Sequence, residues 1–232
     1  MTPPRLSARD LGWAVGGRFV LHDVALDAAA GSITIVTGDN GAGKSTLLEL
    51  LAGLRQPDRG QVALDGVPMP EVEPAVLARR VARLGHKPGV YLDLSARENV
   101  ALLAALAGVA ADARAIDDAL HTVGLDRRDR DRPVRGFSRG MLQRTALARL
   151  LLVGCDVWLL DEPSTGLDVA GTERLIAVVK SARSRGTCVV VATHDPVLLP
   201  LADRRVWLVH GHLVDVAPPP VAPTAGSALG AP

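Results

Sequence analysis

The sequence Gly38-Asp39-Asn40-Gly41-Ala42-Gly43-Lys44-Ser45-Thr46 matches the phosphate-binding P-loop pattern G-x-x-x-x-G-K-[ST]. It follows an apolar run, Ile33 to Thr37, and opens a segment with helical spacing, Lys44 to Gly53. Glycines in such a loop let backbone N–H groups turn towards phosphate oxygens, and the helix N-terminus adds partial positive charge. A strand before the loop and a helix after it favour a nucleotide site over an ordinary Gly-rich turn.

Two side chains of this loop have roles of their own. Lys44 is expected to bridge the β- and γ-phosphates, and the Ser45 hydroxyl is expected to be a Mg²⁺ ligand. The rest of the cradle, residues 38–46, is expected to bind through its backbone. The loop alone does not identify the class of NTPase, because kinases, GTPases and motor ATPases share it.

Two carboxylates, Asp161 and Glu162, directly follow the apolar run Val157 to Leu160. Ligands of open α/β sheets bind at the carboxyl ends of such buried strands. We expect Asp161 to hold Mg²⁺ and Glu162 to be the general base that orients and deprotonates the attacking water. The alternative for the pair alone is a polar strand end before a turn at Pro163.

A histidine follows another buried run in the same way. The run Cys188 to Ala192 is followed by Thr193 and His194, so His194 is expected on the same sheet edge as Asp161. There it could hydrogen-bond the γ-phosphate. A lone histidine at a strand end is otherwise an ordinary solvated residue.

The wider pattern predicts an α/β fold. Short apolar runs alternate with Ala/Leu/Arg segments at helical spacing, which is typical of a mostly parallel sheet covered by helices. Roughly the first 30 residues and the segment Gln61 to Asp65 alternate instead, which predicts a small N-terminal antiparallel sheet with turns at Gly16-Gly17 and Asp65-Gly66.

Helices are predicted between Leu94 and Gly124 and over Arg139 to Leu152, which form an inserted helical subdomain at about 92–152. The chain is therefore expected to be one domain over residues 1–216. Residues 217–232, rich in Pro and Ala, are expected to be a disordered tail.

Composition limits the partners. The formal net charge is +1 with both signs interspersed, so no nucleic-acid partner is expected. No stretch reaches the ~20 apolar residues of a spanning helix, and residues 1–10 lack the apolar core of a secretory signal, so a cytoplasmic protein is expected. Cys155 and Cys188 are expected to be buried free thiols.

A further motif, Phe137-Ser138-Arg139-Gly140-Met141-Leu142-Gln143-Arg144, precedes the last of these helices. Alone, Ser138 would be an ordinary helix N-cap. In this position the motif resembles the signature of ATP-binding cassette proteins, whose commoner form is Leu-Ser-Gly-Gly-Gln. Together with the P-loop, the acidic pair, the Ser164 to Asp168 loop and His194, the resemblance spans about Leu6 to Asp215.

The resemblance implies a P-loop NTPase fold with a RecA-like core, and ATP and Mg²⁺ as its ligands. It also implies that two copies pack head to tail, so that the Ser138 hydroxyl and the Gly140 amide of one copy touch the γ-phosphate held by the other. Loss of the γ-phosphate would open the pair. A separate transmembrane subunit would use this motion, which implies a peripheral place on the inner face of the cell membrane.

Two positions depart from the family pattern. The aromatic residue that stacks on adenine aligns with Val15, for which Trp13 or Phe19 could substitute. The Mg²⁺-binding glutamine aligns with His86, whose neutral imidazole could contact the metal or its water. The retained Lys44 and Glu162 still predict an active ATPase. Within the signature, Arg139 and Met141 replace the usual Gly and Gln.

The segment Gly85 to Tyr91, followed by Arg97-Glu98-Asn99, resembles the loop of bacterial haem-exporter ATPases of cytochrome c biogenesis. Similar loops occur in multidrug and other small-molecule export ATPases. In the family this loop and the helical subdomain receive the membrane subunit, so Tyr91 is a contact candidate. An ordinary exposed loop is the alternative.

Three other readings are open to a cassette-like chain. A soluble cassette ATPase of DNA repair or chromosome structure usually has long coiled coils, and no sustained heptad is present. A translation-factor cassette normally has two copies in one chain, and this chain has one. A P-loop kinase lacks the signature segment.

Overall fold

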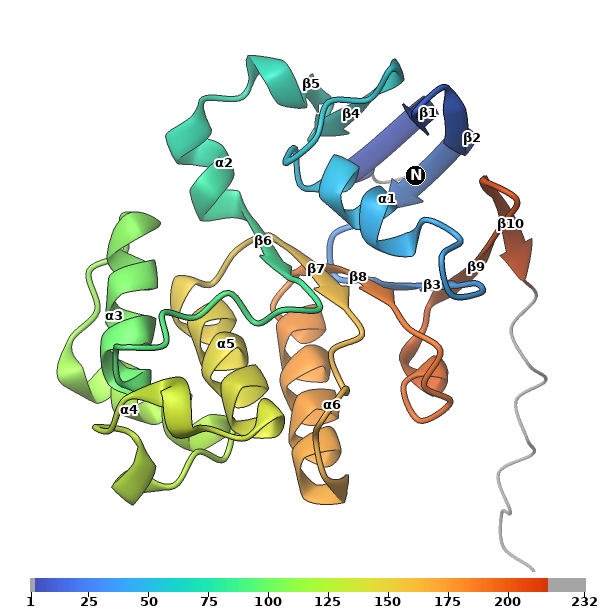
Figure 1. Cartoon of the computed structure of the whole chain (residues 1–232). Helices are drawn as coiled ribbons and strands as arrows, with labels where there is room; N and C mark the ends of the chain where they lie inside the picture. Colours follow the sequence, from blue (N-terminus) through green and yellow to red (C-terminus); the bar gives the residue numbers. More distant parts are fainter. Residues whose placement is uncertain (1–2, 217–232) are drawn as a thin grey trace, which may run out of the picture.

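The computed structural model describes residues 3–216 (Figure 1). The predicted tail, 217–232, lies outside the described residues. Residues 3–216 form two β-sheets. The larger sheet has six strands in the order β10-β9-β3-β8-β7-β6. Its strands are β3 (Ile33–Thr37), β6 (Val81–Leu84), β7 (Val157–Asp161), β8 (Cys188–Ala192), β9 (Arg204–Val209) and β10 (His212–Val216). All pair in parallel except β9 with β10.

Strand β7 shows why the central runs are continuously apolar. Val157 and Leu159 pack into the core on the face of the sheet that α1 covers, whereas Trp158 and Leu160 pack into the core on the opposite face. A strand buried on both faces needs apolar residues at every position. The polar residues that follow such a strand therefore lie at its carboxyl end, where the chain leaves the core.

The second sheet is antiparallel and covers the other side of α1. Its order is β2-β1-β4-β5. Its strands are β1 (Leu6–Val15), β2 (Arg18–Ala28), β4 (Arg59–Leu64) and β5 (Val67–Pro68). The β1–β2 turn falls at Gly16-Gly17 and the β4–β5 turn at Asp65-Gly66, all with positive φ. The N-terminal antiparallel sheet predicted from the alternating pattern is therefore confirmed.

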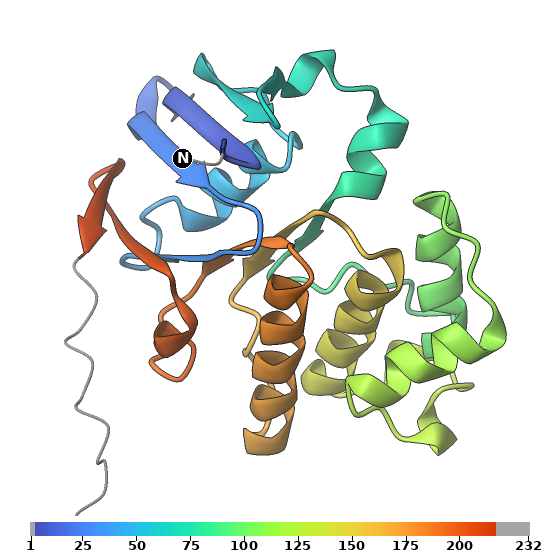
Figure 2. The same cartoon turned by 180° about the vertical axis from the view of Figure 1, so that it is seen from behind.

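Helices cover the parallel sheet on both faces (Figures 1 and 2). The α-helices of the described residues are α1 (Lys44–Leu51), α2 (Pro74–Arg80), α3 (Ala96–Leu106), α4 (Ala113–Thr122), α5 (Arg139–Val153) and α6 (Val169–Ser184). Both views show α5 and α6 on the face opposite α1, with α3 and α4 beside α5. The predicted α/β class with an inserted helical subdomain is confirmed. Among residues 3–216, none of the helices has the length and hydropathy that spanning a bilayer demands.

Both cysteines are buried and free. Burial in apolar surroundings disfavours the thiolate, and it raises the pKa of Cys155 to about 11 and the pKa of Cys188 to about 12. We expect both thiols of the folded protein to react with a disulfide reagent at pH 8 about 100-fold more slowly than in urea, because the thiolate is the nucleophile. A colorimetric thiol assay measures this ratio.

The same shifts fix the sign of a pH effect. The unfolded chain loses its thiol protons near its ordinary pKa of 9.0, before the folded chain does. The contribution of the thiols to stability is therefore complete below that pH and falls as the pH rises towards the folded pKa. If the thiols of the folded protein reacted with the disulfide reagent at pH 8 as fast as they do in urea, the burial of both side chains would be contradicted.

Candidate active site

The P-loop connects the end of β3 to the start of α1. Gly43 is the N-cap of α1 with a φ of 104°, and no side chain caps the helix. The N–H groups of the first turn therefore have no side-chain acceptor and remain for an anion. Gly38 is needed for a different reason, because a Cβ at this position would lie 2.4 Å from the Leu208 carbonyl oxygen.

Lys44 is held by its own loop. Its Nζ donates to the carbonyl oxygens of Gly38, at 2.6 Å, and Asp39, at 2.9 Å. The side chain is buried, so few rotamers are open to it. The ammonium group therefore stands among the same backbone that would bind phosphate, and it adds a full positive charge there.

A cleft of about 440 Å³ opens above this loop. Most of the residues selected from the sequence meet in it. Its walls are formed by Asn40, Gly41, Gly43, Lys44, Ser45 and Thr46 of the loop, by Asp161, Glu162, His86 and His194, and by Trp13, Val20 and Thr165. The P-loop, the strand-end carboxylates and the histidine thus face one space.

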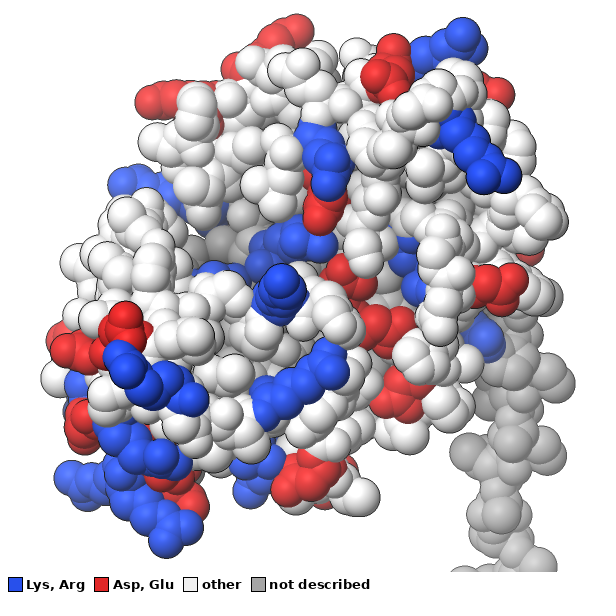
Figure 3. All heavy atoms as spheres, viewed as in Figure 1, with Lys and Arg blue, Asp and Glu red and all other residues white. Residues whose placement is uncertain are grey.

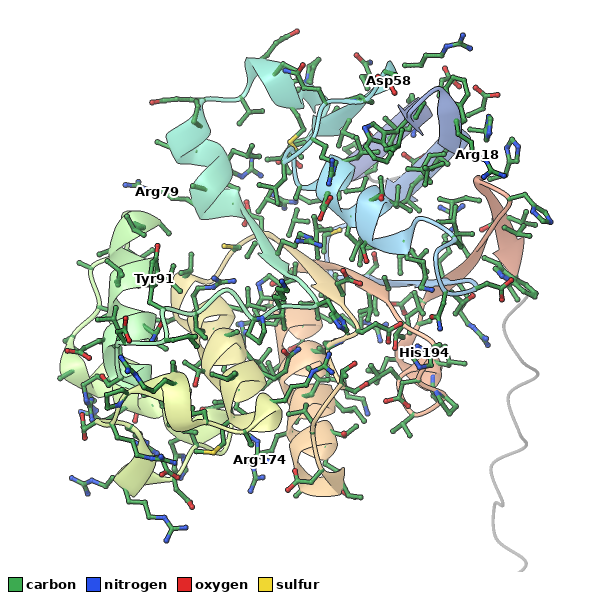
Figure 4. The ribbon with its side chains drawn as sticks, in the orientation of Figure 1. Arg18, Asp58, Arg79, Tyr91, Arg174 and His194 are labelled. Atoms are coloured by element: carbon green, nitrogen blue, oxygen red, sulfur yellow. The ribbon has the colours of Figure 1, made fainter. Side chains whose placement is uncertain are left out.

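Glu162 is fixed in this cleft by its neighbours. It has a φ of 48°, and its N–H donates to the Ala192 carbonyl oxygen at 2.8 Å. Thr193 Oγ1 donates to Oε2 at 3.0 Å, and His194 Nδ1 lies 2.8 Å from Oε1. Figure 4 shows His194 beside the carboxyl ends of β7 and β8. A carboxylate held at both oxygens near an exposed imidazole is suited to activating a water molecule.

Asp161 is almost fully buried, with 3% of its surface exposed, and lies on the same cleft as Ser45. A carboxylate and a hydroxyl are hard oxygen donors of the kind that Mg²⁺ prefers, so these two residues fit the metal. No group of three or more His, Cys, Asp or Glu side chains within residues 3–216 could hold a metal unaided. Other ligands would have to come from a nucleotide and water.

His86 lines the cleft but is engaged elsewhere. Its Nε2 lies 3.1 Å from Nη2 of Arg139. A guanidinium donates hydrogen bonds and cannot accept one. The imidazole is therefore the acceptor of this contact, and the nitrogen facing Arg139 is not turned to a metal. The role of His86 as a Mg²⁺ ligand stays a prediction.

Gly38, Asp39 and Ala42 of the P-loop are not among the residues that line the cleft, and three predicted residues from other parts of the chain do not line it either. Val15 is exposed at the end of β1, whereas Trp13 and Val20 line the cleft. Ser138 caps α5 by accepting from the Met141 N–H at 3.3 Å. Gly140 is buried against the loop after β7. The signature residues thus lie outside the nucleotide cleft of their own chain, and the roles of all three stay predictions.

Comparison with protein families gives one match that covers most of this architecture. The family described as ABC transporter matches residues 21–165. This chain belongs to the ABC transporter family. The match includes the P-loop, the signature segment and the acidic pair, and it confirms the resemblance to ATP-binding cassettes. The chain is therefore an ABC-type, ATP-binding ATPase subunit.

Curated relatives of this ABC cassette have similar lengths. One is "Cytochrome c biogenesis ATP-binding export protein CcmA" of Gluconobacter oxydans, which is 40% identical over 88% of this chain and 89% of its own. "Cytochrome c biogenesis ATP-binding export protein CcmA 2" of Cupriavidus metallidurans is 42% identical over 82% of this chain and 89% of its own.

Among solved structures, a dimer of MJ0796, titled a bacterial ABC transporter cassette, has a TM-score of 0.82 at 24% identity, covering 90% of this chain and 96% of that one. A structure titled as the ATP-binding subunit of an ABC transporter also has a TM-score of 0.82, at 26% identity, covering 90% of this chain and 87% of that one. These likenesses agree with the fold of the cassette.

The cassette also has contacts around the site that its sequence does not predict. Arg83 contacts Asp161, with Nη2 and Oδ2 at 3.3 Å. Gln143, one turn into α5, donates to the Pro163 carbonyl oxygen at 3.0 Å and so fixes the segment after the acidic pair. Neither contact follows from spacing, because each joins residues that only the tertiary fold brings together.

Proposed function

We propose that this cassette hydrolyses ATP to drive a separate transmembrane exporter that serves cytochrome c biogenesis. The hydrolytic part is supported above all by one observation, the Glu162 carboxylate held by Thr193 and His194 at a cleft that also contains Lys44. The export part is supported by the names of the relatives, which match this chain over most of its length. An exporter of another small molecule or of drugs is the second candidate.

In this proposal the phosphates of ATP lie on the backbone N–H groups of the P-loop and against Lys44. Mg²⁺, when bound, neutralises the phosphate charge, and Ser45 and Asp161 would hold it. Glu162 accepts a proton from the water that attacks the γ-phosphorus, and the bond to the ADP oxygen breaks. His194, placed by Glu162, hydrogen-bonds the γ-phosphate.

A second copy of the chain completes the site in this proposal. Ser138 and Gly140 do not face their own cleft, which supports a head-to-tail pair in which they reach the nucleotide of the other copy. Gly140 is packed so tightly that a Cβ would lie 2.5 Å from the Gly166 carbonyl oxygen. No side chain fits at this position. In this proposal the Gly140 N–H, in the first turn of α5, therefore donates to the γ-phosphate of the other copy.

The membrane partner is proposed to dock near the loop before α3. Tyr91 is exposed there, yet the loop is held in shape by Asn99, whose Oδ1 accepts from the Tyr91 N–H at 2.6 Å and whose Nδ2 donates to the Tyr91 carbonyl oxygen at 2.9 Å. Figure 4 shows Tyr91 beside α3. Through this partner the cassette would lie on the inner face of the cell membrane.

Deletion of the gene in its host tests the export assignment. We expect loss of covalently haem-bearing c-type cytochromes, measured by haem staining of denaturing gels, and restoration by the intact gene on a plasmid. The purified cassette should also co-purify with a polytopic membrane protein. Normal c-type cytochromes in the deletion strain would refute the assignment to cytochrome c biogenesis and favour the second candidate.

A further inference from the structure

A salt bridge lies behind the nucleotide cleft. Arg83 stands on β6, where it pairs with Leu159 of β7. Its Nη2 lies 3.3 Å from Asp161 Oδ2 and 3.3 Å from Glu49 Oε1 on α1. Over residues 3–216, Arg83 is the one basic side chain that pairs with Asp161. It neutralises the charge of a carboxylate that has only 3% of its surface exposed.

The same carboxylate is assigned to Mg²⁺ in the proposed function. A buried carboxylate without a cation is costly, so a nucleotide-free protein needs a substitute for the metal. Asp161 Oδ2 is taken by Arg83 in this structure. A guanidinium and Mg²⁺ repel each other at short range, so Mg²⁺ binds Asp161 more weakly while Arg83 stays in contact with this carboxylate.

Arg83 borders open space on one side of the sheet. It forms part of the wall of an open cleft of about 310 Å³, which lies between the β6 edge of the sheet, α3 and the end of α5. Figure 3 shows a hollow in this part of the surface, between the α2 and α3 regions, with basic atoms at its edge. Space for the guanidinium also depends on Gly85, where a Cβ would lie 2.8 Å from Arg83 Nη1.

We propose that Arg83 is a positioning residue that acts as the counter-ion of Asp161 in the nucleotide-free protein and releases this carboxylate to Mg²⁺ when nucleotide binds. The inference rests on the proposed role of Asp161. Arg83 then holds the empty site in shape and weakens Mg²⁺ binding, because its charge must be displaced. A purely structural arginine would affect stability equally with and without the metal.

The test is Arg83→Met, which removes the charge and keeps much of the length of the side chain. Without Mg²⁺ we expect the melting temperature to fall by roughly 5 °C, because Asp161 loses its counter-ion. With saturating ADP we expect the Mg²⁺ concentration at half-maximal thermal stabilisation to fall on the order of tenfold. Thermal melts in ADP with EDTA, and then with increasing MgCl₂, measure both effects.

Arg80→Met is the matched control. Arg80 also joins two carboxylates, Asp65 and Asp156, but lies away from Asp161. The Arg80→Met substitution should lower the melting temperature without changing the Mg²⁺ concentration at half-maximal stabilisation. Arg83→Lys should restore most of the wild-type midpoint. Gly85→Ala, which has no positive φ to strain and pushes only on the guanidinium, should shift the midpoint in the direction of Arg83→Met.

Two results would overturn the inference. An unchanged Mg²⁺ midpoint in both Arg83→Met and Gly85→Ala would show that Arg83 does not compete with the metal. An equal shift in Arg80→Met would show a general loss of charge instead. If the wild-type protein itself showed no Mg²⁺-dependent stabilisation with ADP, the assignment of Asp161 in the proposed function would fail as well.

Discussion

Glu162→Gln is expected to reduce ATP hydrolysis by about 10²–10⁴-fold while leaving nucleotide binding intact. The amide keeps the shape of the carboxylate but cannot accept a proton from water. Its oxygen can still accept from Thr193 Oγ1, and its nitrogen can donate to His194, so the local geometry should persist. Steady-state phosphate release measures the loss, and a fluorescent ADP analogue measures the affinity.

The proposed pairing of two copies gives this variant a second readout. Because ATP would persist between the copies, size-exclusion chromatography in Mg-ATP should show a dimer that the wild-type protein does not accumulate. Glu173→Gln is a suitable control, since this glutamate is exposed on α6, away from the cleft. A wild-type rate in Glu162→Gln would rule out Glu162 as the base.

The interior of the fold was predictable because burial on both faces leaves a strong pattern. The runs at β3, β7 and β8 are apolar at nearly every position, and each is followed by polar residues of the site. The edge strands were not predicted. β6 and β10 have only one neighbour each in the sheet, and the half-buried Arg83 and the exposed Asp215 interrupt their apolar pattern.

The site was predictable where function depends on local geometry. The P-loop and the acidic pair are contiguous in sequence, so their chemistry can be read from spacing. Contacts that join distant elements leave no such trace. The Arg83–Asp161 pair spans two strands, and Trp13 reaches the cleft from β1 of the other sheet. For this reason the choice among Val15, Trp13 and Phe19 at the adenine could not be made from the sequence.

Lys44→Ala is expected to weaken ATP and ADP binding by about 100-fold and to abolish measurable hydrolysis. A charge-assisted hydrogen bond to a phosphate contributes about 1.5–3 kcal/mol, and in the proposed complex the ammonium reaches the β-phosphate that ATP and ADP share. The side chain is already held at the loop by Gly38 and Asp39, so it need not be ordered when nucleotide binds. Titration calorimetry with ADP measures the affinity.

The chain supplies its own control for this substitution, because it contains only three lysines, Lys44, Lys87 and Lys180. Lys180→Ala removes the same charge from an exposed position on α6 and should leave affinity unchanged. Lys44→Ala also removes two hydrogen bonds that tie the loop together, so its melting temperature without nucleotide separates lost stability from lost binding. Within residues 3–216, Lys44 is the one lysine that lines the cleft. A stable Lys44→Ala protein with wild-type ADP affinity would therefore mean that the phosphates bind elsewhere.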